Sequence, residues 1–245
     1  MINSYAMTDV GRIRTVNQDY VFSCLEPIGN LPNLFIVADG MGGHQAGDFA
    51  SSYSVKKFLE SVSLSLQKNP HKIFDDAIRH ANRELIEKSK ENPDLKGMGT
   101  TMVVLTIEGD KAYVANVGDS RLYLLEDKLI QITIDHSLVQ EMIRIGELTK
   151  EDARLHPDKN IITRAVGAGK DIKADFFEFR LTKKSVLLMC SDGLSNMVDD
   201  EQLAQILKSG QTSEKISKKL VDTANKNGGK DNIAVIVLKS DSGEV

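Results

Sequence analysis

The sequence predicts an α+β protein in which antiparallel sheets carry helices on their outer faces. Two observations indicate this class. Segments with the composition of strands come in blocks, and segments with helical periodicity come in groups between those blocks. Strands and helices do not alternate strictly, as they would in a doubly wound parallel sheet. With 245 residues the chain is long enough for one large domain, which we expect to span residues 1–245.

The first third of the chain is expected to form three strands and then two helices. Short apolar or β-rich runs predict strands over residues 2–7, 20–25 and 34–38, the first of them at a sheet edge. Apolar residues then recur at helical spacing over 49–66 and 73–86. These two helices are expected to pack as an antiparallel pair on one face of a sheet.

The remainder is expected to be rich in strands, with two further helices near its end. We expect strands over residues 100–107, 111–117, 120–125, 129–134, 174–181, 185–190 and 233–238. The first four should form a β-meander, because Gly109-Asp110 is a good hairpin turn. Asp135-His136-Ser137 should start a short helix, and Thr149-Lys150-Glu151-Asp152 resembles a capping box. Longer helices are expected over 201–207 and 213–225.

Composition and charge exclude several classes of function. The net charge is −4 and the pI about 5.8, whereas nucleic-acid binders are usually basic. No apolar stretch approaches the roughly 20 residues that span a bilayer. The first residues lack the charged-then-apolar pattern of a signal peptide. We therefore expect a cytoplasmic protein that binds no nucleic acid and does not insert into a membrane.

Acidic residues recur at the ends of the apolar runs. Asp39 follows the run 34–38 and precedes glycines, so Asp39-Gly40 is expected to turn. Asp119 and Asp192 follow two other predicted strands, and Asp231 precedes the last one. Four carboxylates at the ends of predicted strands indicate one oxygen-rich metal site, built from segments that are far apart in the sequence.

Carboxylates, a glycine carbonyl and water suit Mg²⁺ or Mn²⁺, whereas zinc would favour His and Cys. Two such ions about 3.5–4 Å apart can share a hydroxide and clamp a phosphoryl group. Arg14 is the best candidate to hold the phosphate, since a guanidinium binds its oxygens in a bidentate manner. The residues thus indicate metal-assisted phosphoester hydrolysis. They do not separate a phosphomonoesterase from a nuclease or another two-metal hydrolase.

Six short motifs occur in a fixed order and are spread over nearly the whole chain. They are Gly11-x-x-Arg14-x-x-Asn17-Gln18-Asp19, Val37-Ala38-Asp39-Gly40-Met41-Gly42-Gly43-His44, Gly99-Thr100-Thr101, Asn116-Val117-Gly118-Asp119-Ser120-Arg121, Ser191-Asp192-Gly193-Leu194 and Gly229-Lys230-Asp231-Asn232. Each is weak alone, but the ordered series resembles the type 2C, or PPM, metal-dependent protein serine/threonine phosphatases in their bacterial form. The resemblance implies a four-layer α-β-β-α sandwich, two antiparallel sheets flanked by helix pairs. It also implies hydrolysis of phosphoserine and phosphothreonine without a phosphoenzyme, in opposition to a Ser/Thr kinase.

The resemblance further implies a role for each motif residue. Asp39 would bridge two metal ions, the Gly40 carbonyl would ligate one, and Asp192 and Asp231 the other. Asp119, with Asp192, would match a third, weaker ion site. The catalytic set would be Arg14, Asp39, Asp192 and Asp231, with Arg14 on the substrate phosphate. Asp19 would orient a metal-bound water and is counted with the metal residues. Residues 135–168 would include the family's mobile flap.

Two positions depart from the pattern, and two other functions stay open. Met41 stands where some members carry a histidine proposed as general acid, and His44 should not inherit that role. Gln18 stands where some members carry glutamate, so the second ion could be held more weakly. The alternatives are a hydrolase of small phosphomonoesters and a non-catalytic adaptor that binds phosphoproteins. We expect the chain to act as a monomer.

Overall fold

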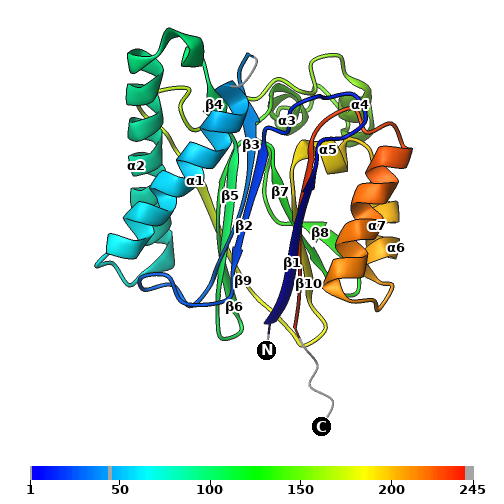
Figure 1. Ribbon diagram of the computed structural model, residues 1–245. Helices are drawn as coiled ribbons and strands as arrows, with labels where there is room; N and C mark the ends of the chain where they lie inside the picture. Colours follow the sequence, from blue (N-terminus) through cyan, green and yellow to red (C-terminus); the bar gives the residue numbers. More distant parts are fainter. Residues whose placement is uncertain (1, 44–45, 241–245) are drawn as a thin grey trace.

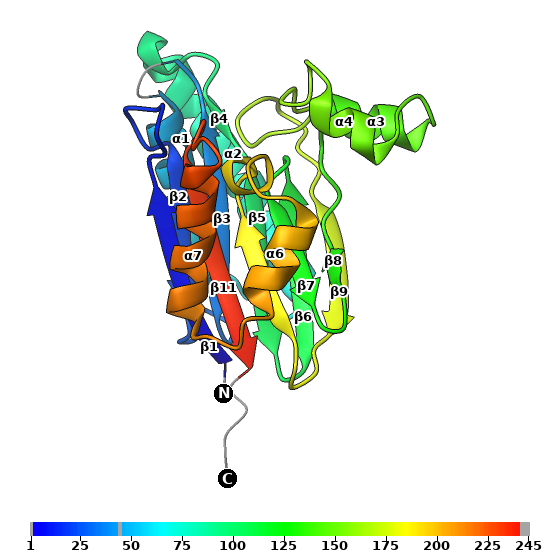
Figure 2. The same ribbon diagram turned by 90° about the vertical axis from the view of Figure 1, so that its right-hand side faces the viewer.

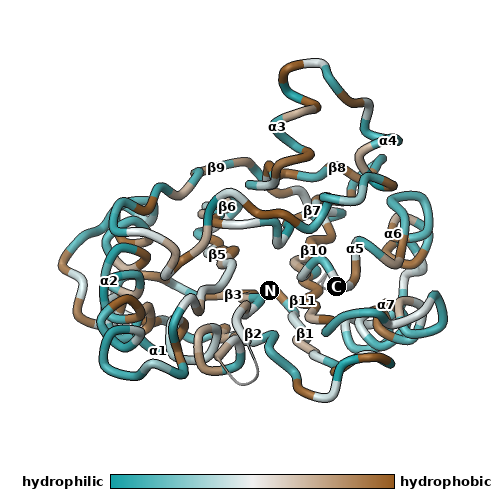
Figure 3. Tube along the Cα trace, turned by 90° about the horizontal axis from the view of Figure 1, so that it is seen from above, coloured by the Kyte–Doolittle hydropathy of each residue, from teal (hydrophilic) through white to brown (hydrophobic). Residues whose placement is uncertain are grey.

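The computed structural model describes residues 2–43 and 46–240, which form a four-layer sandwich. Two antiparallel sheets lie face to face, and helices cover both outer faces (Figure 1). Seen from above, the layers run from α1 and α2 through both sheets to α6 and α7 (Figure 3). The predicted α-β-β-α sandwich is confirmed.

Each sheet combines strands from distant parts of the sequence. One sheet has the order β1 (Ile2–Asp9), β11 (Ile233–Ser240), β10 (Val186–Cys190), β7 (Arg121–Leu125) and β8 (Leu129–Gln131). The other has the order β2 (Asp19–Cys24), β3 (Leu34–Met41), β5 (Met102–Glu108), β6 (Lys111–Val117) and β9 (Asp175–Arg180), with β4 (Gly99–Thr100) paired to the end of β3. The edge position predicted for the first strand is confirmed.

The helices divide into two outer pairs and several short pieces. The outer helices are α1 (Ala46–Leu64) and α2 (Pro70–Glu91) on one side, and α6 (Asp200–Leu207) and α7 (Ser213–Lys226) on the other. The short ones are η1 (Pro93–Leu95), α3 (Leu138–Arg144), α4 (Lys150–Leu155) and α5 (Asp192–Ser195). Helices α3 and α4 stand beyond the ends of the strands, beside the sandwich (Figure 2). Among the described residues, no helix is long and apolar enough to cross a membrane.

The core explains why the central strands are continuously apolar. Successive side chains of β3 point to opposite faces, so Leu34 and Ile36 pack under the helices while Phe35 and Val37 pack between the sheets. All four are fully buried. Burial on both faces removes the polar alternation of a half-exposed strand. The central strand β3 therefore meets solvent at its end rather than along its faces.

The expected β-meander is wrong, because the chain changes sheets after β6. Strand β6 pairs with β5 and β9, whereas β7 pairs with β10 and β8. The crossing is made at Gly118, whose φ is +104°. A Cβ there would lie 2.6 Å from the Thr101 side chain, so a larger residue would need both strain and displacement. The crossing leaves Asp119 at the end of the sandwich, between the two sheets.

The expected Asp39-Gly40 turn is also wrong, because β3 continues through Met41. Gly40 donates its N–H to the Gln18 carbonyl at 3.0 Å and pairs with Thr100 of β4. A Cβ on Gly40 would lie 1.9 Å from the Gly47 carbonyl oxygen. Gly193 likewise lies inside α5, and its Cβ would lie 1.8 Å from the Asn232 carbonyl oxygen. Both glycines permit close backbone approach rather than a turn.

We predict that Gly193→Ala destabilises the metal-free protein by about 1–3 kcal/mol, because the added methyl must displace the Asn232 main chain. Urea unfolding in EDTA measures this change without any contribution from ion binding. Gly169→Ala is the matched control, since nothing lies within 4 Å of its added Cβ. Equal unfolding midpoints for the two variants would contradict the prediction.

Candidate metal centre

Five aspartates meet at the end of the sandwich where β3 ends and α5 begins (Figure 1). They come from separate segments: the start of β2, the end of β3, the crossing after β6, the start of α5 and the turn before β11. In that order they are Asp19, Asp39, Asp119, Asp192 and Asp231. The structure thus brings together every acidic residue that the sequence predicted for the site.

Asp19 and Asp39 form the centre of the group. They lie opposite each other in the β2–β3 pair, and the charge of Asp19 helps to raise the pKa of Asp39. Ser191 Oγ donates to Asp19 Oδ2 at 2.6 Å, which fixes that carboxyl. The other oxygen of Asp19, Oδ1, is buried with no hydrogen-bond partner. A buried acceptor without a donor is costly, and a bound cation or ordered water would satisfy it.

Burial and mutual repulsion raise the pKa of these carboxyls. Burial is the larger cause for Asp19, whose pKa rises to about 7 as Asp192 and Asp231 add like charge. The pKa of Asp39 rises well above its usual range through burial and then through Asp19 and Asp192. Burial and neighbouring Asp231 also raise the pKa of Asp192. Asp39 and Asp192 keep part of their surface in solvent at the mouth of the site.

Asp119 lies at the side of the site nearest α3. Its side chain is buried, and burial followed by the charge of Asp192 raises its pKa to about 8. Arg121 acts in the opposite direction and lowers the pKa of Asp119. A carboxylate whose ionised form is disfavoured by its neighbours gains most from a cation placed among them.

Asp231 and Arg14 form the exposed rim. Arg14 Nη2 donates to Asp231 Oδ2 at 2.9 Å, and the Asn232 N–H donates to Oδ1 at 2.9 Å. The side chains of Arg14 and Asp231 are 49% and 36% exposed, so both can reach a substrate from solvent. Asn232 is itself buried and donates to the carbonyls of Val10 and Val16, which holds the loop that carries Arg14.

Two supporting hydroxyls were not identified from the sequence as parts of the site. Thr101 Oγ1 accepts the Asp39 N–H at 2.9 Å and lies 2.7 Å from Ser120 Oγ. Ser191 Oγ accepts the Ala234 N–H at 2.9 Å while donating to Asp19. Both residues belong to motifs found in the sequence, Gly99-Thr100-Thr101 and Ser191-Asp192-Gly193-Leu194. Membership in a motif does not reveal a hydrogen-bond partner far along the chain.

The remaining predicted positions flank the aspartates. Gly40 is buried in β3, with its carbonyl beside Gly47 at the start of α1. The Gln18 side chain packs against the same Gly47. Met41 ends β3 and borders Gly99. His44 lies outside the described residues.

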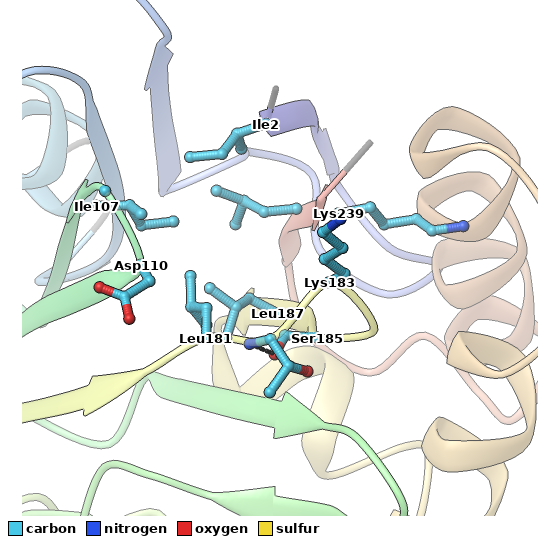
Figure 4. A pocket seen from close by; sticks show the side chains of 11 residues that line it. Ile2, Ile107, Asp110, Leu181, Lys183, Ser185, Leu187 and Lys239 are labelled. Carbon is cyan, nitrogen blue, oxygen red and sulfur yellow. Dashed lines mark hydrogen bonds between the residues drawn. The ribbon is translucent and has the colours of Figure 1, made fainter. Parts of the chain in front are cut away.

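A cavity of about 480 Å³ opens directly beside this group. Asp119 and Asp192 form one wall, and Gln140 and Arg154 from α3 and α4 form another. A second cavity, of about 170 Å³, lies between the sheets at the opposite end of the molecule and is largely apolar (Figure 4). The first cavity adjoins Asp119 and Asp192, so it is the candidate substrate space.

The donor set fits hard divalent cations that keep much of their water. Within residues 2–43 and 46–240, no three His, Cys, Asp or Glu side chains converge closely enough to ligate an ion by themselves. Magnesium commonly takes one or two carboxylates and fills its other positions with water and substrate oxygens. The unpartnered Asp19 oxygen and the surrounding like charges agree with that kind of site.

Comparisons with known proteins agree with this geometry. The model of the protein phosphatase 2C family matches residues 12–236. The serine/threonine phosphatase stp of Listeria monocytogenes (strain F2365) is 41% identical over 239 residues, covering 96% of this chain and 94% of that protein. Protein phosphatase PhpP of Streptococcus pneumoniae (strain D39) is 37% identical over 236 residues, with 95% of each covered.

Solved structures give the same result. The Mycobacterium tuberculosis serine/threonine phosphatase PstP/Ppp superposes with a TM-score of 0.88 at 32% identity, covering 97% of this chain and 98% of that one. The catalytic domain of PstP in complex with two manganese ions gives a TM-score of 0.85 at 31% identity, with 97% of each chain covered. On the family match and these relatives, the chain belongs to the protein phosphatase 2C family.

Proposed function

We propose that this protein hydrolyses phosphoserine and phosphothreonine in other proteins at a divalent metal centre. The observation that carries the proposal is the meeting of five aspartates from separate segments beside an open cavity, with an arginine at the rim. The names of the relatives support the substrate class. Metal dependence as Mg²⁺ or Mn²⁺ is supported by the oxygen donors and by the manganese-containing relative.

For the metal centre, we assign Asp39, the Gly40 carbonyl, Asp192 and Asp231 to two ions, and Asp119 with Asp192 to a third. Such ions, when bound, lower the pKa of water and so supply a nucleophile at neutral pH. Asp39 is held on its backbone by Thr101, so its carboxylate is positioned before any ligand binds.

Asp19 and Arg14 then act on the reactants. The free Oδ1 of Asp19 can accept a hydrogen bond from the attacking water and orient it. The Arg14 guanidinium can hold two phosphate oxygens and stabilise the negative charge that develops on them. With Met41 beside the site, we assign protonation of the leaving alkoxide to water rather than to His44.

Several wider assignments follow from the same proposal. Phosphoproteins are the substrates, and a Ser/Thr kinase that makes them is the opposing enzyme. We place the activity in the cytoplasm, in a monomer without nucleic-acid partners, consistent with the net charge of −4. Residues 1–245 act as one domain, with 135–168 as a flap beside the cavity.

Asp39→Asn should lower Mn²⁺-dependent phosphate release from a phosphothreonine peptide by more than about 100-fold, since direct ligands matter more than their outer partners. EDTA should abolish the wild-type activity. Asp222→Asn is the matched control, because Asp222 is an exposed acid on α7 and does not line the cavity. Wild-type turnover that survives EDTA would refute the metal mechanism. Folded protein that binds Mn²⁺ but releases no phosphate would favour the adaptor alternative. Release of phosphate from small phosphomonoesters, but not from the peptide, would favour the alternative of a small-molecule phosphatase.

Asp119→Asn should stabilise the metal-free protein at pH 8. Its pKa is raised from 3.8 to about 8, so the folded state binds a proton more tightly than the unfolded state does. The resulting destabilisation is absent below about pH 4 and complete above about pH 8. One pKa unit corresponds to about 1.4 kcal/mol, so the midpoint should rise by at least about 2–4 °C.

Thermal unfolding in EDTA at pH 5.5 and pH 8 checks this sign. The gain from Asp119→Asn should shrink at the lower pH, where the wild-type carboxyl is already protonated in the folded state. Saturating Mn²⁺ should reverse the order, because the wild type then gains more binding energy. If Asp119→Asn raised the unfolding temperature as much or more at pH 5.5 than at pH 8, the raised pKa assigned to Asp119 would be contradicted.

A further inference from the structure

Residues 135–137 begin the segment that carries α3 and α4 (residues 135–155, the α3–α4 segment), and each of the three has a separate partner. Ser137 Oγ accepts the Gln140 N–H at 3.2 Å and caps α3. The two residues before it, Asp135 and His136, are buried and face back toward the turn that carries Asp119. The sequence placed a helix start here but assigned no role to Asp135 or His136.

His136 holds the residue immediately before Asp119. The Gly118 N–H donates to Nδ1 of the His136 ring at 3.1 Å. In return the His136 N–H donates to the Gly118 carbonyl at 2.9 Å. Gly118 has a φ of +104° and could adopt many other conformations, so these two bonds select the one observed.

Asp135 holds the residue two positions after Asp119. The Arg121 guanidinium donates to both oxygens of Asp135, with Nε–Oδ1 at 3.1 Å and Nη2–Oδ2 at 2.6 Å. Gln131 donates to the same carboxylate at 2.8 Å. The turn Gly118–Arg121 is therefore fixed on both sides of Asp119 by neighbouring residues of one segment.

The far side of the His136 ring contacts residues that follow α4 in the chain, including the first residue of β9. Nε2 lies 3.1 Å from Asp175 Oδ2, and Arg164 donates to Oδ1 of the same carboxylate at 2.8 Å. The Thr163 N–H donates to the His136 carbonyl at 2.7 Å. Since Nδ1 accepts from Gly118, Nε2 carries the hydrogen and donates to Asp175. Burial lowers the pKa of His136, which favours this neutral form.

We propose that His136 is a positioning residue that sets the affinity of the Asp119 ion site and couples it to the α3–α4 segment. The inference rests on the assignment of Asp119 as a ligand of a divalent cation. Partners behind a metal ligand typically change affinity by about 10- to 100-fold. Here His136 acts through the backbone of the turn that carries Asp119, and its own ring is held by Asp175 at the start of β9.

Two substitutions separate the two sides of the ring. His136→Asn places a carbonyl oxygen near Nδ1, so it can still accept from Gly118 but gives up Asp175. His136→Gln places an amide near Nε2, so it can still donate to Asp175 but gives up Gly118. His71→Gln is the matched control, because the His71 ring contacts the Phe177 carbonyl at 3.1 Å, away from the aspartate group.

Calorimetric titration with Mn²⁺ measures the affinity directly, without turnover. His136→Gln should weaken the lower-affinity site by about 10-fold, whereas His136→Asn should stay within about 3-fold of wild type. Amide hydrogen exchange at Gly118 should accelerate in the Gln variant only. The KM for a phosphothreonine peptide should stay unchanged in both, since Arg14 holds the phosphate, while kcat at limiting Mn²⁺ falls in the Gln variant.

Equal Mn²⁺ affinity in wild type and both His136 variants would overturn the proposal, as would equal losses in the two variants. Faster Gly118 exchange with unchanged Mn²⁺ affinity would overturn it while leaving the proposed phosphatase activity intact. If wild type binds Mn²⁺ but hydrolyses no phosphopeptide, the proposed function fails instead. Should His136→Gln not fold, Asp175→Ala provides the second test, because it frees the ring at a half-exposed partner. It should weaken the same site to a smaller extent.

Discussion

The burial of several carboxyl groups close together is the constraint on which the rest of the structure depends. Asp19, Asp39 and Asp192 each have a raised pKa, because burial and like neighbours disfavour their ionised forms. The folded protein keeps this unfavourable group only because the two sheets around it are well packed. Hydrogen bonds such as the one from Ser191 to Asp19 hold these carboxyl groups in place. In that arrangement a bound cation would offset the cost of ionising them.

The sandwich solves the problem of bringing acids together from across the chain. Strands buried on both faces end at a common rim, so an aspartate at a strand end lies beside others that are distant in sequence. The rim must also let backbones approach, and Gly40 and Gly193 have no space for a side chain. The same two glycines follow the acids Asp39 and Asp192, so the Asp-Gly pairs combine a ligand with the close packing that positions it.

Most helices and strands, and the aspartates that the structure brings together, were predicted from the sequence. The residues that hold those aspartates in place were not. Strand β3 could be predicted because burial on both of its faces makes its sequence continuously apolar. The acids could be identified because each lies next to such an apolar run. The Asp39-Gly40 turn was wrong, since pairing with Thr100 from a distant segment overrides a local turn preference. The meander was wrong for a similar reason, because local hairpin signals do not specify which sheet a strand joins. Ser191 was missed because its partner Asp19 lies far away in the sequence.

The site divides into a rigid part and a part that depends on the α3–α4 segment. Asp39 lies in a paired strand, and Asp192 begins a helix packed against β11. Asp119 instead lies in the crossing between sheets, where the residues on either side are held by Asp135 and His136. On the proposed assignments, a movement of this segment would change the affinity of the Asp119 ion while the Asp39 centre kept its geometry. On the same assignments, the Asp119 ion and the Asp39 centre share Asp192, but they differ in the residues that support them, so a change in one set of supports leaves the other set in place.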